Sequence, residues 1–398
     1  MSSSPVAPTE AVTDHRDRRL VRTFFLTQTL GYLALFTALP VTLGPMTHDL
    51  GETRTHLALA STIAILTGAV AAVPIGRLLD RSGGRLTMTT GSVLQGLGLL
   101  GWATSDSLTQ LYASFAVIGL AQAMSTYDTA FAVIVATLRD AERQKAIVAV
   151  TMVAGICTYG VSPLLGWTEL MWGWRWTVAG LGLVMLFLTA PLHLAVVPGS
   201  ALHRERSANS TGLGLRGVLR NRDFWLVAAS LTLQTAATTA LMTLLVAFLR
   251  DAGMTAMVAA TMPLVVGLAQ ITSRLALRGP GAKVPLARIC VGAFVAQALG
   301  LLLLPGAGDT VWLVALCMVA VGIGSGIGVV ARPVVLADTF GTLQFATVLA
   351  VLSVPLTTAR AFSPLVGAWL HDWRFPVVFG LLSLVAAAAM LPAARRSR

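Results

Sequence analysis

The sequence predicts an all-α membrane protein of about twelve transmembrane helices, built as two six-helix bundles with both termini in the cytoplasm. Three observations predict this fold class. Hydrophobic residues make up 56% of the chain and charged residues only 11%, whereas a soluble domain has about 25% charged residues. Long apolar stretches recur along the chain, and several short motifs occur twice, half a chain length apart.

Each apolar stretch is about 20 residues or longer, which suffices to cross a hydrocarbon layer of about 30 Å. In lipid the backbone polar groups must bond within their own segment, so these stretches should be helices. The expected spans are residues 22–47, 57–79, 86–105, 108–138, 146–168, 174–196, 223–249, 254–276, 284–305, 310–338, 345–370 and 375–392. We expect an N-terminal tail at 1–21, bundles at 22–197 and 223–392, a linker at 198–222 and a C-terminal tail at 393–398.

The net charge of +11 follows the sidedness of these spans. If the N-terminus is cytoplasmic, most of the 28 Lys and Arg residues fall in cytoplasmic segments. The outer loops then hold only Arg54, Arg175, Arg250 and Arg374. Because Lys and Arg are retained on the cytoplasmic side, this bias sets the orientation. The basic character is therefore a topology signal, and we expect a lipid bilayer but no nucleic acid as partner.

Three motifs repeat in register. Ser162-Pro-Leu-Leu-Gly166 recurs as Ser363-Pro-Leu-Val-Gly367, Trp174-Arg-Trp176 recurs as Trp373-Arg-Phe375, and Arg77-Leu-Leu-Asp-Arg81 has an echo in Arg274-Leu-Ala-Leu-Arg278. Since each half has an even number of spans, the two halves enter the membrane from the same side. They are therefore parallel repeats, related by an axis along the membrane normal.

The segment after the second span reads Gly76-Arg-Leu-Leu-Asp80-Arg81-Ser-Gly83-Gly-Arg85. Gly76 allows close helix approach, Asp80 suits a helix N-terminus or nearby arginines, and Gly83 allows a tight turn. The pattern resembles the signature Gly-x-x-x-Asp-Arg/Lys-x-Gly-x-Arg/Lys of the major facilitator superfamily.

The resemblance implies a conformational latch. In that family the aspartate contacts the start of helix 11 and an arginine near the end of helix 4, here Arg139 or Arg143. The latch residues would be Gly76, Asp80, Arg81, Gly83, Arg85, Arg139 and Arg143. The alternative is that Arg81 and Arg85 only hold the loop in the cytoplasm. The echo in the second half has Leu277 in place of the acid, which predicts weaker bracing there.

Three charged residues stand out within the expected spans: Asp128, Arg332 and Arg360. Such residues cost at least about 2.5 kcal/mol each on insertion and usually have a function. On a continuous fourth helix, Gln122, Ser125, Thr126 and Thr129 would share one face. The resemblance implies that helices 1, 4, 7 and 10 line a central cavity. The site candidates are Asp128, Arg332, Arg360, Gln122, Thr126, Tyr127, Tyr159, Gln234, Gln28 and Tyr32.

Two interpretations of these charges remain open. Asp128 and an arginine could form a buried ion pair that locks the halves together. Alternatively, Arg332 or Arg360 binds an anionic substrate through its planar fork, while Asp128 carries a coupling proton. Two arginines against one acid favour an anion.

Several function classes are excluded by the sequence. An ATP-driven pump would need a phosphate-binding loop with a lysine, but the chain's lysines, Lys145 and Lys283, lie in no such setting. The glycines at 322, 324, 326 and 328 fit helix packing rather than a nucleotide loop. No cluster with metal-ligand spacing is present, and Cys157, Cys290 and Cys317 read as small apolar residues. We therefore expect no enzyme, cofactor, metal or nucleotide.

The predicted function is a secondary active transporter of a small solute, with a preference for an organic anion such as a monocarboxylate. It would work by alternating access, with proton coupling, as a monomer in a bacterial inner membrane. Leu50 to Thr55 and Ala337 to Gly341 resemble the monocarboxylate and oxalate branch of the superfamily. Gly155, Gly160, Pro163 and Gly166 loosely resemble its drug–proton antiporters, so efflux remains the alternative. A channel or transport-derived sensor is a remote one.

Overall fold

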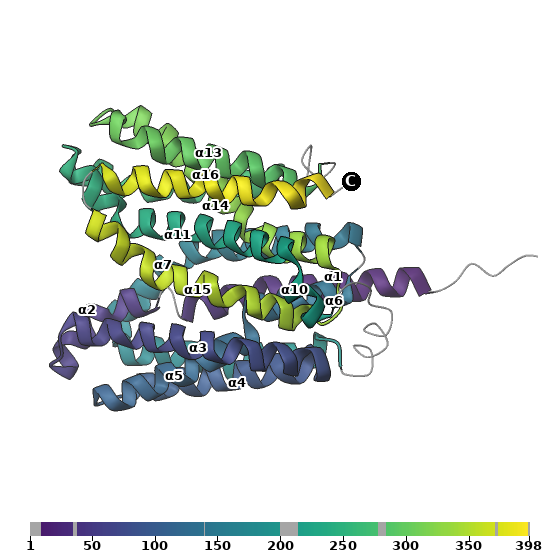
Figure 1. Ribbon diagram of the computed structural model, residues 1–398. Helices are drawn as coiled ribbons and strands as arrows, with labels where there is room; N and C mark the ends of the chain where they lie inside the picture. Colours follow the sequence, from purple (N-terminus) through teal and green to yellow (C-terminus); the bar gives the residue numbers. More distant parts are fainter. Residues whose placement is uncertain are drawn as a thin grey trace, which may run out of the picture. The chain divides into compact units, whose positions relative to one another are not determined.

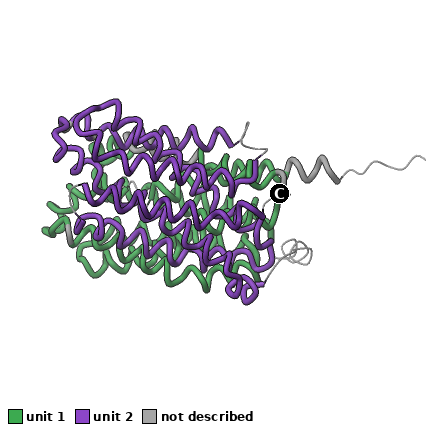
Figure 2. The backbone as a smooth tube through the Cα atoms, turned by 45° about the horizontal axis from the view of Figure 1, so that its top comes forward, with its two compact units in different colours: residues 1–209 green, residues 210–398 purple. Residues whose placement is uncertain are grey.

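The computed structural model describes residues 9–34, 38–138, 140–199, 214–277, 284–370 and 373–396. Within these ranges, the side chains of residues 9–15, 55, 140–141, 153–163, 256 and 260 are outside the description. The chain forms two compact units, Met1–Asn209 and Ser210–Arg398 (Figure 2). Every regular element of the described residues is helical.

Unit 1 begins with a helix that starts earlier than expected. Its helices are α1 Thr9–Tyr32, α2 Ala38–Leu50, α3 Arg54–Ser82, α4 Gly84–Ala103, α5 Leu108–Ser125, α6 Tyr127–Thr137, α7 Asp140–Val184 and α8 Ala190–Val196, with a π-helical turn at Met185–Thr189 before α8 (Figure 1). The expected tail at 1–21 overlaps this helix, since α1 already runs from Thr9. Arginine and leucine are good helix formers, and they extend the helix ahead of the apolar stretch.

The long helix α7 contains a break that separates two of the expected spans. Gly173 has φ +80° and ψ +165°, so two helices meet there without a loop between them. This backbone conformation lies in a region that is open to glycine and costly for residues with a Cβ. The break follows the expected end of one span at residue 168 and precedes the expected start of the next at residue 174.

Unit 2 repeats this plan with longer uninterrupted helices. They are α10 Leu215–Arg220, α11 Arg222–Asp251, α12 Ala256–Ala276, α13 Leu286–Ala307, α14 Val311–Phe340, α15 Phe345–Leu370 and α16 Arg374–Arg396. The short helix α10 lies inside the segment that the sequence assigns to the linker. Its first backbone amide, at Leu215, donates to the side-chain oxygen of Gln344, 2.8 Å away in the turn between α14 and α15.

Nine helices in the described part of the chain are long and apolar enough to cross a membrane. They include α3, the combined stretch Leu108–Thr137, and all of α11 to α16. The molecule is therefore a multi-pass helical membrane protein. The expected spans 22–47, 86–105 and 146–168 are not among the nine, and the total of twelve stays a prediction.

Helix pairing follows the same order in the two units. In unit 1, α5 packs against α3 and α4, and α4 packs against α7 and α8; in unit 2, α14 packs against α12 and α13, and α13 packs against α16. Each unit has its own hydrophobic core, around Trp102 and Phe115 in the first and around Phe375 and Phe379 in the second. The internal duplication inferred from three short motifs thus extends to the packing.

Glycines bring the paired helices into backbone contact. A Cβ on Gly119 of α5 would lie 2.1 Å from the carbonyl oxygen of Ala64 on α3. In α14, Gly322 and Gly326 face α12, whereas Gly324 faces α13. Small residues are the usual means of close helix approach in lipid, where apolar side chains gain little by leaving the solvent. These glycines of α14 therefore allow α12 and α13 to pack closely against it.

An arginine caps the last helix of each unit. Arg85 in the first turn of α4 donates from Nε to the carbonyl oxygen of Val197, just past α8, at 2.9 Å. Arg288 in the first turn of α13 donates from Nε to the carbonyl oxygen of Ala394 in α16, at 3.1 Å. The last carbonyl oxygens of a helix lack intrahelical partners. Each arginine therefore stabilises a helix end by donating a hydrogen bond to a carbonyl oxygen there.

Gly119→Ala should destabilise the protein, because the added methyl group meets backbone atoms of α3 that cannot rotate away. We expect a loss of about 1–3 kcal/mol, the usual effect of overpacking, seen as a lower midpoint of thermal unfolding in detergent. Gly180→Ala is the control, since no atom lies within 4 Å of a Cβ at that position. Equal midpoints for the two variants would contradict the close contact.

Candidate functional site

The stretch Leu108–Thr137 is not the continuous helix that the sequence predicts. It breaks at Thr126, whose φ of −94° and ψ of −164° are extended, so α5 ends at Ser125 and α6 begins at Tyr127. Gln122 and Thr129 therefore do not share one uninterrupted helical face, and that prediction is wrong. We define this interruption, with the residues that contact it, as the α5–α6 break.

Hydroxyl side chains bond backbone carbonyl oxygens at this break. Thr126 Oγ1 donates to the carbonyl oxygen of Gln122 at 2.7 Å, and Thr129 Oγ1 donates to that of Ala123 at 2.8 Å. Such side chains compete with the backbone for its acceptors, which makes serine and threonine poor residues for a helix interior. Three of the five residues from Ser125 to Thr129 carry an aliphatic hydroxyl. This local composition is the signal that a search for apolar periodicity overlooks.

Gln28 of α1 stabilises the open end of α5. Its side-chain Nε2 donates to the carbonyl oxygen of Ser125 at 2.9 Å, and the residue is fully buried. The other amide atom, Oε1, is buried and has no hydrogen-bond partner. Gln122 Nε2 is buried without a partner as well. Two orphaned amide atoms thus lie on residues that contact or adjoin the break, although buried polar groups are normally paired.

Aromatic rings line the same region. The rings of Tyr32 and Tyr127 lie 4.3 Å apart between centroids, and Tyr127 stacks on Phe131 at 5.2 Å. Asp128 is half-buried in the first turn of α6, where the helix dipole favours a negative charge. Six predicted site residues therefore gather at the break: Gln28, Tyr32, Gln122, Thr126, Tyr127 and Asp128.

In unit 2 the structure separates the two arginines of the prediction. Arg332 in α14 is buried, with 8% of its surface exposed, and its Nη1 lies 3.5 Å from Ser353 Oγ of α15. Arg360, in the second half of α15, is exposed. A third arginine was missed: Arg274, near the end of the expected span 254–276, is buried in the last turn of α12 and donates from Nε to the carbonyl oxygen of Gly326 at 3.2 Å.

Gln234, a predicted site residue, belongs to a buried amide network whose other members the sequence did not predict. Its Nε2 lies 3.0 Å from Thr238 Oγ1 and 3.3 Å from Gln297 Oε1, and Gln297 Nε2 reaches Ser383 Oγ at 3.4 Å. The counterpart in unit 1 is Gln95 of α4, which donates to the carbonyl oxygen of Gly31 at 3.2 Å. For both Gln297 and Gln95, the signal in the sequence was a single glutamine within an apolar stretch.

Five of the seven predicted latch residues, from Gly76 to Arg85, lie in α3, in α4 or in the turn between them. Gly83, with φ +80°, ends α3 and precedes α4. Gly76 is buried, Asp80 half-buried and Arg81 exposed. Arg143 Nε donates to the carbonyl oxygen of Leu138 at 3.0 Å, which caps α6. Arg139 lies outside the described residues, as does the side chain of Tyr159.

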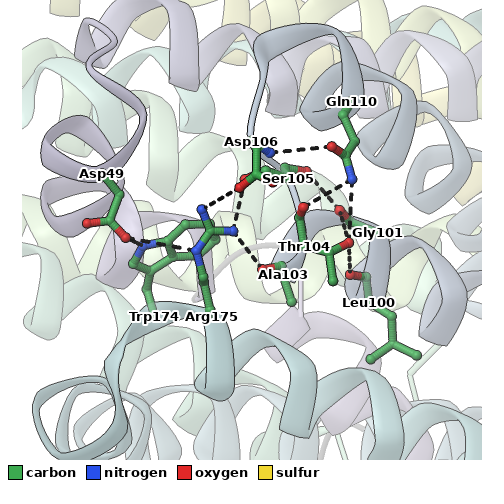
Figure 3. A network of polar contacts seen from close by, with 10 residues as sticks. All are labelled: Asp49, Leu100, Gly101, Ala103, Thr104, Ser105, Asp106, Gln110, Trp174 and Arg175. Carbon is green, nitrogen blue, oxygen red and sulfur yellow. Dashed lines mark hydrogen bonds and ion pairs between the residues drawn. The ribbon is translucent and has the colours of Figure 1, made fainter.

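The opposite end of α4 is held by a polar network that the sequence analysis did not predict (Figure 3). Arg175 Nη1 donates to the carbonyl oxygens of Ala103 and Ser105 at 3.0 and 2.9 Å, and its Nη2 pairs with Asp106 at 3.0 Å. Its guanidinium group also lies over the Trp174 ring, at 4.5 Å. The ring nitrogen of Trp174 donates to Asp49 Oδ2 at 2.7 Å, which ties α2 to the start of the second part of α7.

No group of three or more His, Cys, Asp or Glu residues able to hold a metal occurs among the described side chains. Buried arginines and amides instead lie within membrane-spanning helices. Such groups in transmembrane segments typically mark the path of a substrate or ion. Helices long enough to cross a membrane, arranged in two repeated units with polar groups in the middle of helices, are typical of multi-pass membrane transport proteins.

Comparison with known proteins identifies the family. The Major Facilitator Superfamily profile matches residues 24–319, and the chain belongs to that superfamily. Its members are transporters, and this chain is accordingly a membrane transporter of small molecules rather than an enzyme. No curated protein matches the sequence.

Solved structures share the fold at low sequence identity. The human organic anion transporter MFSD10 (TETRAN) is 18% identical, with a TM-score of 0.75, over 94% of this chain and 99% of that one. The E. coli fucose:proton symporter FucP is 13% identical, with a TM-score of 0.74, over 97% and 99%. The proton:xylose symporter XylE is 15% identical, with a TM-score of 0.68, over 94% and 96%.

Arg85→Ala should lower the stability of unit 1, because the carbonyl oxygen of Val197 loses its charged donor. We expect a cost of about 1.5–3 kcal/mol, typical of a hydrogen bond to a charged group, measured by thermal unfolding in detergent. Arg81→Ala removes an exposed arginine of the same motif and should change the midpoint little. If Arg81→Ala destabilised as much, the loss of basic charge would explain both effects.

Proposed function

We propose that the protein is a proton-coupled carrier that moves a small organic anion, such as a monocarboxylate, across a bacterial inner membrane. It would act as a monomer by alternating access between two bundles, residues 22–197 and 223–392, joined by the linker 198–222. The observation that carries the proposal is the buried Arg332 inside a membrane-spanning helix.

Arg332 supports an anionic substrate for a physical reason. An arginine stays charged at all physiological pH values, so it cannot avoid the cost of burial by losing its proton. That cost is at least about 2.5 kcal/mol at the centre of a transmembrane helix. Its planar fork matches a carboxylate in two parallel hydrogen bonds. Ser353 Oγ, 3.5 Å from Nη1, steadies the guanidinium group in α14.

Asp128 supports proton coupling. It is half-buried at the start of α6, and a carboxyl group can bind and release a proton within one transport cycle. Because one proton cancels the charge of one monocarboxylate, the pH gradient drives their joint movement, and each pH unit, about 1.4 kcal/mol, sustains roughly a tenfold concentration ratio. The structural relatives include two proton symporters and one organic anion transporter, which favours the same combination here.

The latch is part of this proposal. The motif from Gly76 to Arg85, with Arg139 or Arg143, would brace one access state and release it in the other. Arg143 and Arg85 each donate to a carbonyl oxygen at a helix end in unit 1. Their side chains therefore also stabilise helix ends.

Asp128→Asn should abolish accumulation driven by a pH gradient but spare substrate exchange, because the amide cannot carry a proton. The measurement is uptake and counterflow of labelled monocarboxylate in proteoliposomes. Asp309→Asn, which changes an exposed acid between α13 and α14, is the control and should behave as wild type. Undiminished accumulation in Asp128→Asn would remove Asp128 from the coupling role.

Arg332→Lys should weaken substrate binding by about tenfold or more, because an ammonium group keeps the charge but loses the bidentate fork. The concentration that half-saturates uptake measures this effect. Arg360→Lys tests the other predicted arginine in the same way, and Arg216→Lys changes an exposed arginine on α10 as the control. If monocarboxylates neither moved nor competed while a cationic dye was expelled, the protein would be a drug–proton antiporter.

A further inference from the structure

We propose that one acyl chain of a membrane phospholipid lodges in a trough between α13 and α14. The trough is a cavity of about 480 Å³ lined by residues of these two helices, which pack against each other in unit 2 (Figure 1). We call it the α13–α14 trough, and its lining residues fall within 296–307 of α13 and 313–323 of α14.

Small residues form the bottom of the trough and longer ones its sides. Gly300 and Cys317 are buried lining residues, and a Cβ on Gly300 would lie 2.7 Å from the carbonyl oxygen of Cys317, so the two helices touch there. Leu303 of α13 and Leu316 of α14 stand on either side, with 63% and 62% of their surfaces exposed. The lining consists of Gly, Ala, Cys, Val, Leu and Ile residues, which suits a hydrocarbon.

The length of the trough matches one leaflet of a bilayer. The lining runs from Ala296 to Ala307 on α13 and from Leu313 to Ile323 on α14, which is about 15 Å on each helix at 1.5 Å per residue. The hydrocarbon core of a bilayer is about 30 Å thick, so each leaflet contributes about half of it. A single acyl chain can therefore lie along the whole trough.

One end of the trough lies at the turn between α13 and α14, close to a membrane interface. Trp312, beside the lining residue Leu313, is 67% exposed, and exposed tryptophans in membrane helices are typical of the headgroup level. In the predicted topology this turn is on the outer side, so the chain comes from the outer leaflet. The stretch from Pro305 to Trp312 contains no lysine or arginine that could hold a phosphate, which favours recognition of the chain rather than the headgroup.

The width of the trough argues against a helix from a second copy as the occupant. Its volume of about 480 Å³, spread over about 15 Å of helix, gives a mean cross-section of about 30 Å². An α-helix with its side chains is about 10–12 Å across, which corresponds to about 80–110 Å². The trough therefore has room for a thin, flexible chain but not for a helix.

The test uses phosphatidylcholine with a photoreactive diazirine at a chosen carbon of one acyl chain, as a trace in phosphatidylcholine proteoliposomes. After irradiation, peptide mass spectrometry locates the adducts. A diazirine near the glycerol should label the end at Ala307 and Leu313, and one near the terminal methyl group the end at Ala296 and Ile323. Because a lodged chain keeps many dispersion contacts, we expect about fivefold more adduct in the trough than around Leu268, which is 65% exposed on α12.

Gly306→Leu should remove most of the labelling in the trough. Gly306 lines the trough, and no atom lies within 4 Å of a Cβ there, so the new side chain can fill the space without moving the backbone. Gly292→Leu is the matched control, since Gly292 is also exposed on α13 with no atom within 4 Å of a Cβ but does not line the trough. It should label like the wild type. Leu303→Ala, which removes one side of the trough without adding bulk, should also reduce the labelling.

The outcomes separate a lodged chain from its alternatives. Equal labelling of the trough and of the face around Leu268 in the wild type would indicate ordinary solvation by lipid and overturn the inference, as would a reversed order of labelling along the trough. The same chain on phosphatidylglycerol should label equally, and a strict dependence on the headgroup would contradict recognition of the chain. Covalent dimers through the trough, in place of lipid adducts, would make a second copy the occupant. None of these results depends on which solute the protein transports.

Discussion

The structure depends on one constraint: a polar group in lipid must find its partner inside the protein. Many serine and threonine hydroxyl groups in the described helices obey it locally by bonding the carbonyl oxygen three or four residues earlier. Longer side chains donate to the carbonyl oxygens at helix ends, where the helix supplies no donor. Gln28 reaches the open end of α5, and Arg85 and Arg288 reach the ends of α8 and α16. The buried amide atoms that stay unpaired are therefore informative, because the constraint makes them costly.

The same constraint explains what the sequence could predict. Hydrophobic length identified α11 to α16 as spans, because each of these helices is an almost unbroken apolar stretch. Motif repeats predicted the duplication, since a residue type kept in register in both halves is visible without coordinates. The signature from Gly76 to Arg85 predicted the superfamily, and the profile match confirmed it.

The rest depended on side-chain contacts rather than on apolar periodicity. The break at Thr126 coincides with a cluster of side-chain hydroxyl groups, and apolar periodicity continues through it. Arg274 was treated as the counterpart of Arg77, which is exposed, yet the carbonyl oxygen of Gly326 in α14 gives it a buried partner. The polar face expected on the fourth helix is wrong because that helix breaks at Thr126. Gln297 was missed because its partner Gln234 is distant in sequence.

The capping arginines have a consequence for how this protein could be re-engineered. In the predicted topology, Arg85 and Arg288 are among the basic residues that favour a cytoplasmic position, and each also donates to a carbonyl oxygen at the end of another helix in its unit. An attempt to invert the topology by replacing these residues with acidic ones would therefore fray α8 and α16 at the same time. In that topology, a reversal of charge at these two positions would alter sidedness and helix termination together.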